Sequence, residues 1–226
     1  MYDLLYRIIP NVMDKPDELW LAFLQTLYMV SIVAVIALVL GLGLGVILIL
    51  TSPKGLKPNR PVYFVLDKVI NFFRSIPFII LITLLLGLSR MIVGTAIGPK
   101  GALIPLIIGT VPFFSRQVEL AIAEVDGGLV EAARAMGSSV NDIVSRVYLR
   151  EAIPGLLRGV TITLINLIGL TAMAGAVGGG GLGDFAIRYG HGRSQTDVSI
   201  VVILIIYVMV SVIQSLGNYV VRRSRR

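Results

Sequence analysis

Long apolar segments alternate with polar or glycine-rich stretches along the chain. Five such segments run approximately over residues 20–50, 62–88, 101–125, 154–177 and 198–221. An apolar stretch of about 18 residues or more is long enough for a helix that spans a lipid bilayer. The pattern therefore predicts an all-α integral membrane protein with five transmembrane helices.

Glycine and proline positions predict how the first two segments pack and bend. Gly41, Gly43 and Gly45 lie near the end of the first segment, where small residues either let another helix approach closely or face lipid. The second segment is polar in its first half, which we expect to begin outside the hydrocarbon core. Pro77 follows, and it is expected to bend the helix.

The third segment contains both helix breakers and charges. Pro105 and Pro112 are expected to interrupt it. Arg116 and Glu119 lie one helical turn apart near its far end, a spacing at which a cation and a carboxylate partly neutralise each other. Between the apolar segments, we expect loops at 51–61 and 89–100, a polar helical region at 126–153 and a glycine-rich loop at 178–197.

Composition supports a membrane protein and excludes several kinds of site. Hydrophobic residues make up 56% of the 226 residues and charged residues 15%, whereas soluble domains average about 25% charged residues. The absence of cysteine excludes disulfides and thiolate metal sites, and the single histidine, His191, argues against a zinc site or a histidine-based triad. We read His191 as a solvated loop residue and assign it no site.

Basic residues flank the apolar segments, so the net charge of +7 indicates membrane topology rather than nucleic-acid binding. With five spans, the two termini lie on opposite sides of the membrane. Fourteen of the twenty Lys and Arg residues then fall on the side of the C-terminus and of the polar region 126–153. The positive-inside rule predicts a cytoplasmic C-terminus and an N-terminus outside. No cleavable signal peptide is evident, and the first apolar segment is expected to be retained.

The most informative stretch is the polar region from Gly127 to Leu157, GGLVEAARAMGSSVNDIVSRVYLREAIPGLL. Gly127 and Gly128 are expected to make a sharp turn before a short helix over 129–136, which Gly137 ends in a left-handed conformation. A second helix follows, on which four aliphatic residues mark the buried side: Val140, Ile143, Val144 and Val147.

Ser139 and Asp142 form a capping box at the start of the second helix. The first helix presents little bulk at Ala132 and Ala133. Such a helix either enters a cleft in a partner protein or packs on its own protein, and spacing alone does not choose between the two.

This stretch resembles the cytoplasmic loop of ABC-type importer permeases. That loop reads Glu-Ala-Ala, three residues, Gly, nine residues, an aliphatic residue, one residue and Leu-Pro. The chain has Glu131, Ala132 and Ala133, then Gly137, then Val147 and Leu149. It departs from the pattern at Arg150, which replaces the proline and puts the local bend in doubt; Pro154 follows four residues later.

Two further stretches narrow the resemblance. Phe73-Arg74-Ser75-Ile76-Pro77-Phe78 is similar to the Phe-Arg-x-x-Pro segment of amino-acid importer permeases. Residues 162–183, ITLINLIGLTAMAGAVGGGGLG, resemble methionine-importer permeases in particular. The resemblance covers about 19–222, which we expect to form the transmembrane domain with a coupling loop over about 127–150. It leaves 1–18 as an extracytoplasmic segment without an assigned role and 223–226 as a basic cytoplasmic tail.

The resemblance implies a type I ABC importer permease in the bacterial cytoplasmic membrane. Two copies of the chain would assemble with two copies of an ATPase, and an extracytoplasmic binding protein would deliver methionine for transport by alternating access. The chain has no G-x-x-x-x-G-K-[ST] phosphate-binding loop. ATP and Mg²⁺ are therefore expected on the separate ATPase, and neither a cofactor nor an enzymatic activity is expected in this chain.

The resemblance also assigns residues to roles. Coupling to the ATPase would fall to the first short helix and the bend after it. We expect Glu131 to contact the ATPase or to stabilise the start of its helix, the two alanines to provide small size and Gly137 to set the bend. The residues concerned are Glu131, Ala132, Ala133, Arg134, Met136 and Gly137.

Three residues of the fourth segment are expected on the translocation pathway. Met173 either narrows the pathway as a gate or packs between helices. Thr171 and Asn166 either line the route or make interhelical hydrogen bonds. The glycine run 178–181, with Gly183, is expected to form a close-packed turn that touches the binding protein, or else a flexible hinge.

Other functions remain open at this point. A permease of the same family for a polar amino acid or a betaine shares these features. A secondary transporter or channel working alone usually places ionisable residues in mid-membrane, and the first, fourth and fifth segments have none in their central parts. A membrane scaffold without a transport role is the remaining alternative.

Overall fold

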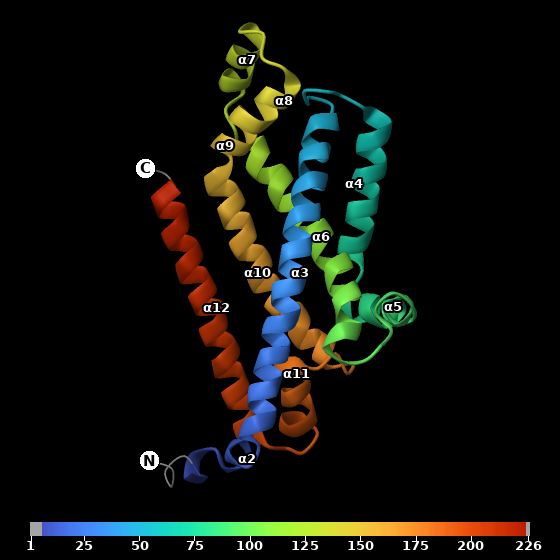
Figure 1. Cartoon of the computed structure of the whole chain (residues 1–226), viewed down its shortest axis with the longest axis vertical. Coiled ribbons are helices and arrows are strands. Elements are labelled where there is room, and N and C mark those ends of the chain that lie inside the picture. The colour runs from blue at the N-terminus through green and yellow to red at the C-terminus, as the bar shows by residue number, and fades with distance from the viewer. Residues whose placement is uncertain (1–5, 225–226) are drawn as a thin grey trace. The chain divides into compact units, whose positions relative to one another are not determined.

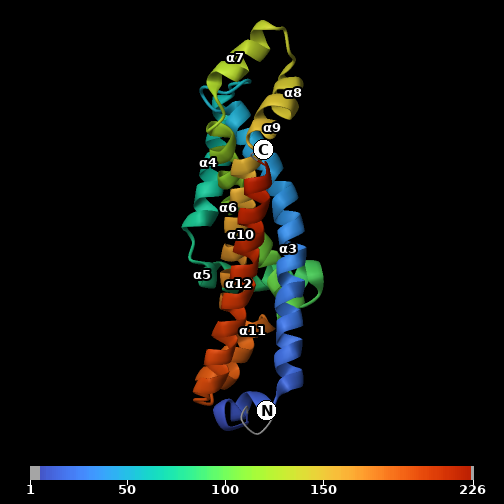
Figure 2. The ribbon, with the colours of Figure 1, turned by 90° about the vertical axis from the view of Figure 1, so that its left-hand side faces the viewer.

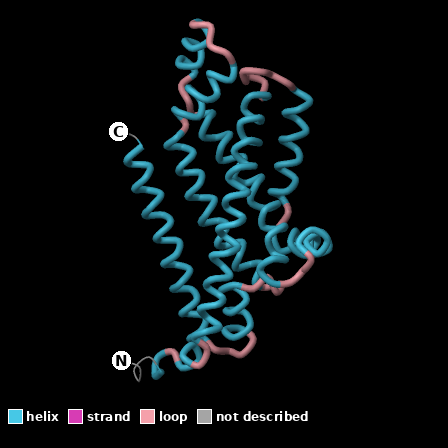
Figure 3. Tube along the Cα trace, viewed as in Figure 1, coloured by secondary structure: helices cyan, strands magenta, loops and turns pink. Residues whose placement is uncertain are grey.

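The structure, a computed structural model, describes residues 6–224 and contains helices and loops but no strand in that range (Figure 3). Figure 1 labels the helices. Those that frame the spans and loops are α2 (Pro10–Met13), α3 (Pro16–Thr51), α4 (Arg60–Ser75), α5 (Phe78–Val93), α6 (Gly98–Ala123), α7 (Gly127–Ala135), α8 (Val140–Asp142), η1 (Ile143–Tyr148), α9 (Leu149–Glu151), α10 (Ile153–Gly175), α11 (Gly181–Phe185), η2 (Ala186–His191) and α12 (Thr196–Ser224).

Four helices in the described part of the chain are long and apolar enough to cross a membrane: α3, α6, α10 and α12. The helices α4 and α5 pass the same test only as a pair, bent at a break of no more than four residues, and together they make a fifth candidate span. The break falls at Ile76 and Pro77, as Pro77 predicted, because proline cannot donate a backbone hydrogen bond within a helix. The all-α membrane fold is thus confirmed.

The chain divides into two compact units, and the described residues of the first are 6–35, 76–109 and 164–213. Its core joins Ala22 of α3 to Leu182, Phe185 and Tyr189 of α11 and η2 and to Val198 of α12. The side chain of Val12, from α2, is buried in the same core. The helix α2 therefore packs on this unit, a role that the sequence did not reveal.

The second unit contains 36–75, 110–163 and 214–224. A β-carbon at Gly41 would lie 2.8 Å from the ring of Phe114, and one at Gly45 would lie 2.5 Å from Val118. No atom lies within 4 Å of such a position at Gly43. Gly41 and Gly45 therefore let α3 approach α6 closely, which decides for helix packing over lipid exposure at two of the three glycines.

Two expectations about the third segment and the loop before it were wrong. The helix α5 continues to Val93 and α6 already begins at Gly98, so the loop is shorter than predicted. The helix α6 also runs without a break through Pro105 and Pro112. Prolines are tolerated inside membrane helices, where no water competes for the backbone and neighbouring groups compensate the lost hydrogen bond.

The glycine-rich stretch 178–197 is largely helical rather than a loop, which corrects a further expectation. Its glycines serve close packing. A β-carbon at Gly183 would lie 2.2 Å from the carbonyl oxygen of Ala172, and one at Gly175 would lie 2.1 Å from the amide nitrogen of Asp184. The segment thus lies tightly against the end of α10, as the close-packed alternative predicted.

Candidate coupling site and pathway residues

The helix α7 is a short, well-capped helix at one end of the second unit, beside α8 (Figures 1 and 2). Asp126 caps its start, because the carboxylate oxygen Oδ1 accepts a 2.8 Å hydrogen bond from the amide of Gly128. Gly127 and Gly128 therefore belong to the first turn of the helix, and the sharp turn predicted there is wrong.

Gly137 ends α7 as predicted. Its φ of +78° is left-handed, a conformation that glycine adopts without steric cost. The amide of Gly137 donates to the carbonyl of Arg134 at 2.9 Å, and the amide of Ser138 donates to that of Ala133 at 3.0 Å. These bonds satisfy carbonyls that the helix end leaves open.

The next helix begins at the predicted cap. The hydroxyl oxygen of Ser139 accepts from the amide of Asp142 at 3.2 Å. The same hydroxyl donates to the Asp142 carboxylate at 2.5 Å, which lowers the pKa of that carboxyl. The helix continues through η1 and α9, where Arg150 is exposed. The helical path runs on through Arg150 to Glu151, and Pro154 lies in the first turn of α10.

The coupling loop packs on the rest of its own unit through a small apolar cluster. Val130 and Ala133 of α7 and Ile143 of η1 are buried together. Val147, Tyr148 and Leu56 pack against them. Of the two alanines in the motif, Ala133 thus packs on its own protein, while Ala132 is exposed.

The other predicted coupling residues lie on the exposed side of α7 and the bend that follows. Glu131, Arg134 and Gly137 are exposed, and the Met136 side chain is 78% exposed. Leu129, which the motif did not single out, is 45% exposed. Leu129, Ala132 and Met136 recur at a spacing of three and four residues, so they form an apolar stripe on one face. Their helical spacing together with the burial of Ala133 reveals this stripe.

A pocket of about 410 Å³ lies between α7 and the ends of α3 and α6. Its apolar wall includes Ile49 and Ile122, while Lys54, Glu131 and Arg134 supply charges. Within the described residues, none of these three charged side chains forms an ion pair. The pocket therefore offers both an apolar surface and free charges, on a side of α7 different from the exposed stripe.

The predicted pathway residues all lie on α10 within the first unit. Met173 is 40% exposed, whereas Thr171 is buried and its hydroxyl donates to the Ile168 carbonyl at 2.7 Å. Asn166 is half-buried. Met173 is the most accessible of the three residues.

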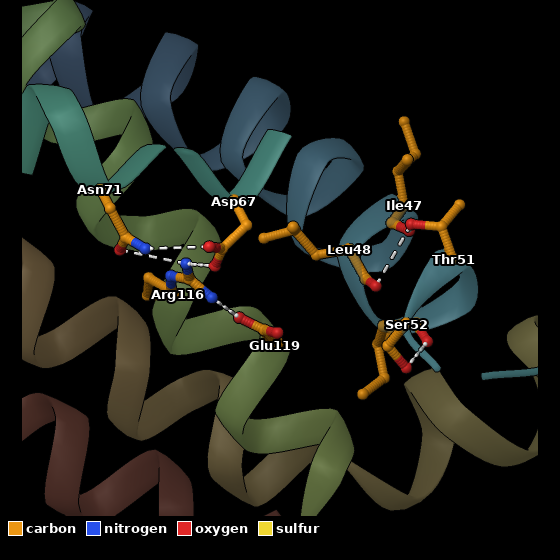
Figure 4. Close-up of polar contacts among 9 residues, drawn as sticks. Ile47, Leu48, Thr51, Ser52, Asp67, Asn71, Arg116 and Glu119 are labelled. Carbon is orange, nitrogen blue, oxygen red and sulfur yellow. Dashed lines mark hydrogen bonds and ion pairs between the residues drawn. The ribbon is translucent and has the colours of Figure 1, made fainter. Parts of the chain in front are cut away.

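A charged cluster links α4 and α6 in the second unit (Figure 4). The guanidinium of Arg116 donates to Glu119 at 2.5 Å, as the sequence predicted, and also to Asp67 and, at 3.1 Å, to Asn71. The amide of Asn71 donates to Asp67 at 3.2 Å. Figure 4 also shows the hydroxyl of Thr51 donating to the carbonyl of Ile47 at 2.7 Å near the end of α3. Sequence reasoning missed Asp67 and Asn71 as partners because 49 and 45 residues separate them from Arg116.

Polar contacts in the first unit tie Asn11 of α2 and Glu18 of α3 to α12 and η2. Both the backbone amide and the side-chain amide of Asn11 donate to the carboxylate of Asp197, at 3.0 and 2.9 Å. The hydroxyl of Tyr189 donates to Glu18 at 2.5 Å, and this bond raises the pKa of the phenol. His191 is exposed at the end of η2. Among the described residues, no group of histidine and carboxylate side chains is arranged to hold a metal ion.

The described residues combine several apolar spans with a capped loop helix, as an integral membrane protein does, and comparison identifies the family. Residues 41–226 match the family described as "Binding-protein-dependent transport system inner membrane component". The chain belongs to this family of inner-membrane transport components.

Two relatives and two solved structures refine the comparison. The chain is 47% identical over 207 residues to a probable D-methionine transport system permease protein, MetI, of Vibrio cholerae, covering 92% of each chain. It is 46% identical over 214 residues to the methionine import system permease protein MetP of Bacillus subtilis, covering 95% of this chain and 96% of MetP.

Among solved structures, an inward-facing conformation of the MetNI methionine ABC transporter matches with a TM-score of 0.91 and 41% identity, over 94% of this chain and 99% of that one. An amino acid ABC transporter crystallised with histidines matches with a TM-score of 0.78 and 20% identity, over 95% of this chain and 98% of the other. The second likeness concerns the fold alone.

Proposed function

We propose that this chain is the membrane-spanning permease subunit of an ATP-driven ABC importer for methionine. The observation that carries the proposal is the similarity, along nearly the whole chain, to permeases named for methionine transport, together with a matching fold. A rival permease for a polar amino acid or a betaine has no comparable support among these relatives.

The proposed partners are a second copy of this chain, two copies of an ATP-binding cassette ATPase and an extracytoplasmic binding protein. ATP hydrolysis would take place on the ATPase, with ATP and Mg²⁺ bound there. This chain would supply the route, the gate and the contact through which nucleotide binding moves the helices. The description of the family as binding-protein-dependent supports the last of these partners.

The proposed contact with the ATPase is the exposed side of α7. Leu129, Ala132 and Met136 offer an apolar stripe that a groove in the partner can cover. Glu131 and Arg134 are exposed on other sides of α7 and form no ion pair in the part of the chain that the structure describes, so they are available to charged groups of the partner. Ala133 and Gly137 act indirectly, since one anchors α7 to its own unit and the other sets the bend.

In the proposed cycle, ATP binding draws the two ATPases together and moves both α7 helices. That movement converts an inward-open permease to an outward-open one, a rigid-body exchange between two states. Met173 is the proposed gate because it is exposed and because methionine adapts its shape to irregular gaps. Asn166 and Thr171 are proposed to shape the route beside it.

The proposed orientation places the N-terminus outside and the C-terminus and α7 in the cytoplasm. The excess of Lys and Arg on the side of α7 supports it. Under this assignment, 1–18 is an extracytoplasmic segment, about 19–222 is the transmembrane domain and the tail 223–226 is cytoplasmic. Residues 225 and 226 lie outside the described range.

The proposal is tested by uptake of labelled methionine in cells that lack this gene, with and without its restoration beside the gene of its ATPase. Restored uptake that depends on ATP and that excess unlabelled methionine suppresses supports both transporter class and solute. Unchanged methionine uptake on restoration contradicts methionine as the solute. Uptake that persists without any ATPase contradicts the transporter class.

A further inference from the structure

Few fixed interactions attach α4 to the rest of the second unit. Ile70 is its only buried residue, while Phe64, Val65 and Phe72 are exposed. Over residues 6–224, every side-chain hydrogen bond from α4 to another helix goes to Arg116. The polar bridge to Arg116 is therefore the main tether of α4.

By contrast, α6 is held firmly in the same unit. A β-carbon at Gly155 of α10 would lie 2.9 Å from that of Ala121, and one at Gly159 would lie 2.9 Å from that of Gln117. Phe114 and Val118 are buried in the core of the unit. The chain runs from the end of α6 through only residues 124–126 into α7. A displacement of α7 is thus passed directly to α6.

We infer that Arg116 is a positioning residue that makes α4 move together with α6 and α7 when the ATPase acts. The inference rests on the proposed function, because it takes α7 to be the helix that receives the movement. The Arg116 side chain is 14% exposed, that of Asp67 23% and that of Glu119 14%. Charge-assisted hydrogen bonds are strong when they are shielded from water, so the bridge can transmit force between two helices.

The chemistry of arginine suits this role. A guanidinium presents donors in a rigid planar fork, and here it engages Glu119 on its own helix and two acceptors on α4 at the same time. A lysine ammonium carries three donors at a single point and cannot span the acceptors in the same way. Arg116→Lys is therefore expected to retain part of the coupling that an uncharged substitution at this position would lose.

The decisive comparison uses two variants that remove charge from different helices. Asp67→Ala combined with Asn71→Ala removes both α4 acceptors and leaves Arg116 paired with Glu119. Glu119→Gln removes the charge of the ion pair within α6 and leaves the α4 bridge. Each variant retains one cation and one carboxylate in the cluster, so the net charges match.

We expect the double alanine variant to assemble with its ATPase and still hydrolyse ATP, but to use about fivefold more ATP per methionine transported, the lower end of typical coupling between sites. Glu119→Gln should keep the unsubstituted ratio. Equal ratios in the two variants, whether both normal or both raised, overturn the inference.

A spectroscopic measurement follows the movement itself. The chain has no cysteine, so Phe64→Cys on α4 and Ser145→Cys on η1 accept a pair of spin labels in the assembled complex. The distance between the labels should stay the same with and without ATP, and it should change with ATP in the double alanine variant. An unchanged distance in that variant overturns the inference. If the unsubstituted complex moves no methionine, the proposed solute fails, while the label distances still test the bridge.

Discussion

Gly137 has a backbone conformation that few other residues adopt. No atom lies within 4 Å of the position of a β-carbon there, so a substitution is penalised by φ alone. A left-handed conformation costs an L-residue about 1–2 kcal/mol, and asparagine pays less than others. Gly137→Val should therefore displace the bend and uncouple ATP hydrolysis from uptake, whereas Gly137→Asn should retain most of the coupling.

The measurement is the ratio of ATP hydrolysed to methionine transported in reconstituted membranes. Gly127→Ala is the matched control. A β-carbon at Gly127 also meets no atom within 4 Å, but Gly127 lies in the helix and does not have a positive φ. Normal coupling in Gly137→Val would refute the role of the bend.

Asp142 provides a pH-dependent prediction. Its folded-state pKa is lowered chiefly by the hydrogen bond from the Ser139 hydroxyl and further by Arg146. A lowered carboxyl pKa stabilises the fold above the ordinary value, and this contribution is lost as the pH falls through the folded-state value. The cap should therefore be intact at neutral pH and should weaken only in acid.

Ser139→Ala should raise the Asp142 pKa toward its ordinary value and speed amide hydrogen exchange in α8 and η1. Nuclear magnetic resonance titration of labelled aspartate measures the first effect. Ser145→Ala is the control, since that hydroxyl donates to the Asn141 carbonyl at 2.8 Å and not to a carboxylate. Equal Asp142 pKa values in the two variants would contradict the assignment.

The sequence revealed the interactions that form between residues close together along the chain. The Gly137 stop, the Ser139 cap and the Arg116–Glu119 pair depend on neighbours within one turn, and all three are present. Asp67 could not be foreseen as a partner of Arg116, because their contact depends on how α4 packs against α6. The motif likewise could not separate Ala132 from Ala133, since burial depends on tertiary packing.

Among the helices, α7 has the clearest interaction face. Its apolar stripe leaves Leu129 and Met136 exposed to solvent in the isolated chain. Burying such a side chain contributes about 1.5–3 kcal/mol, so Leu129→Ser with Met136→Ser should weaken ATPase binding at least about tenfold.

Titration of the detergent-solubilised permease with its purified ATPase tests this prediction. Ile187→Ser is the control, because Ile187 is an exposed apolar residue of η2 in the first unit. Equal affinity for the serine pair and the control would mean that the ATPase binds elsewhere.

The errors at this scale concern proline and glycine. Proline and glycine were read as breakers, as they are in water, yet α6 continues through two prolines and the 178–197 stretch is mostly helical. Within the membrane the backbone has no competing water, so α6 stays helical through both prolines. The glycines then serve close contact, as at Gly183 beside Ala172.

At the scale of the whole molecule, the excess of Lys and Arg on one side predicts that α7 and the C-terminus face the cytoplasm. Ser145→Cys and His191→Cys are both exposed single-cysteine variants in a chain without cysteine. A membrane-impermeant thiol reagent applied to intact spheroplasts should label the His191→Cys chain and spare the Ser145→Cys chain until the membrane is opened. The reverse pattern would invert the proposed topology.

The central claim is ATP-driven import of methionine by this chain with its ATPase. The most direct test is methionine accumulation in proteoliposomes that contain only the purified complex, with binding protein outside and ATP inside. We predict uptake that requires ATP, requires the binding protein, stops on removal of the ATPase and is lost in Gly137→Val. ATP-dependent uptake of a different solute with none of methionine would contradict the solute, and no ATP-dependent uptake of any solute would contradict the account as a whole.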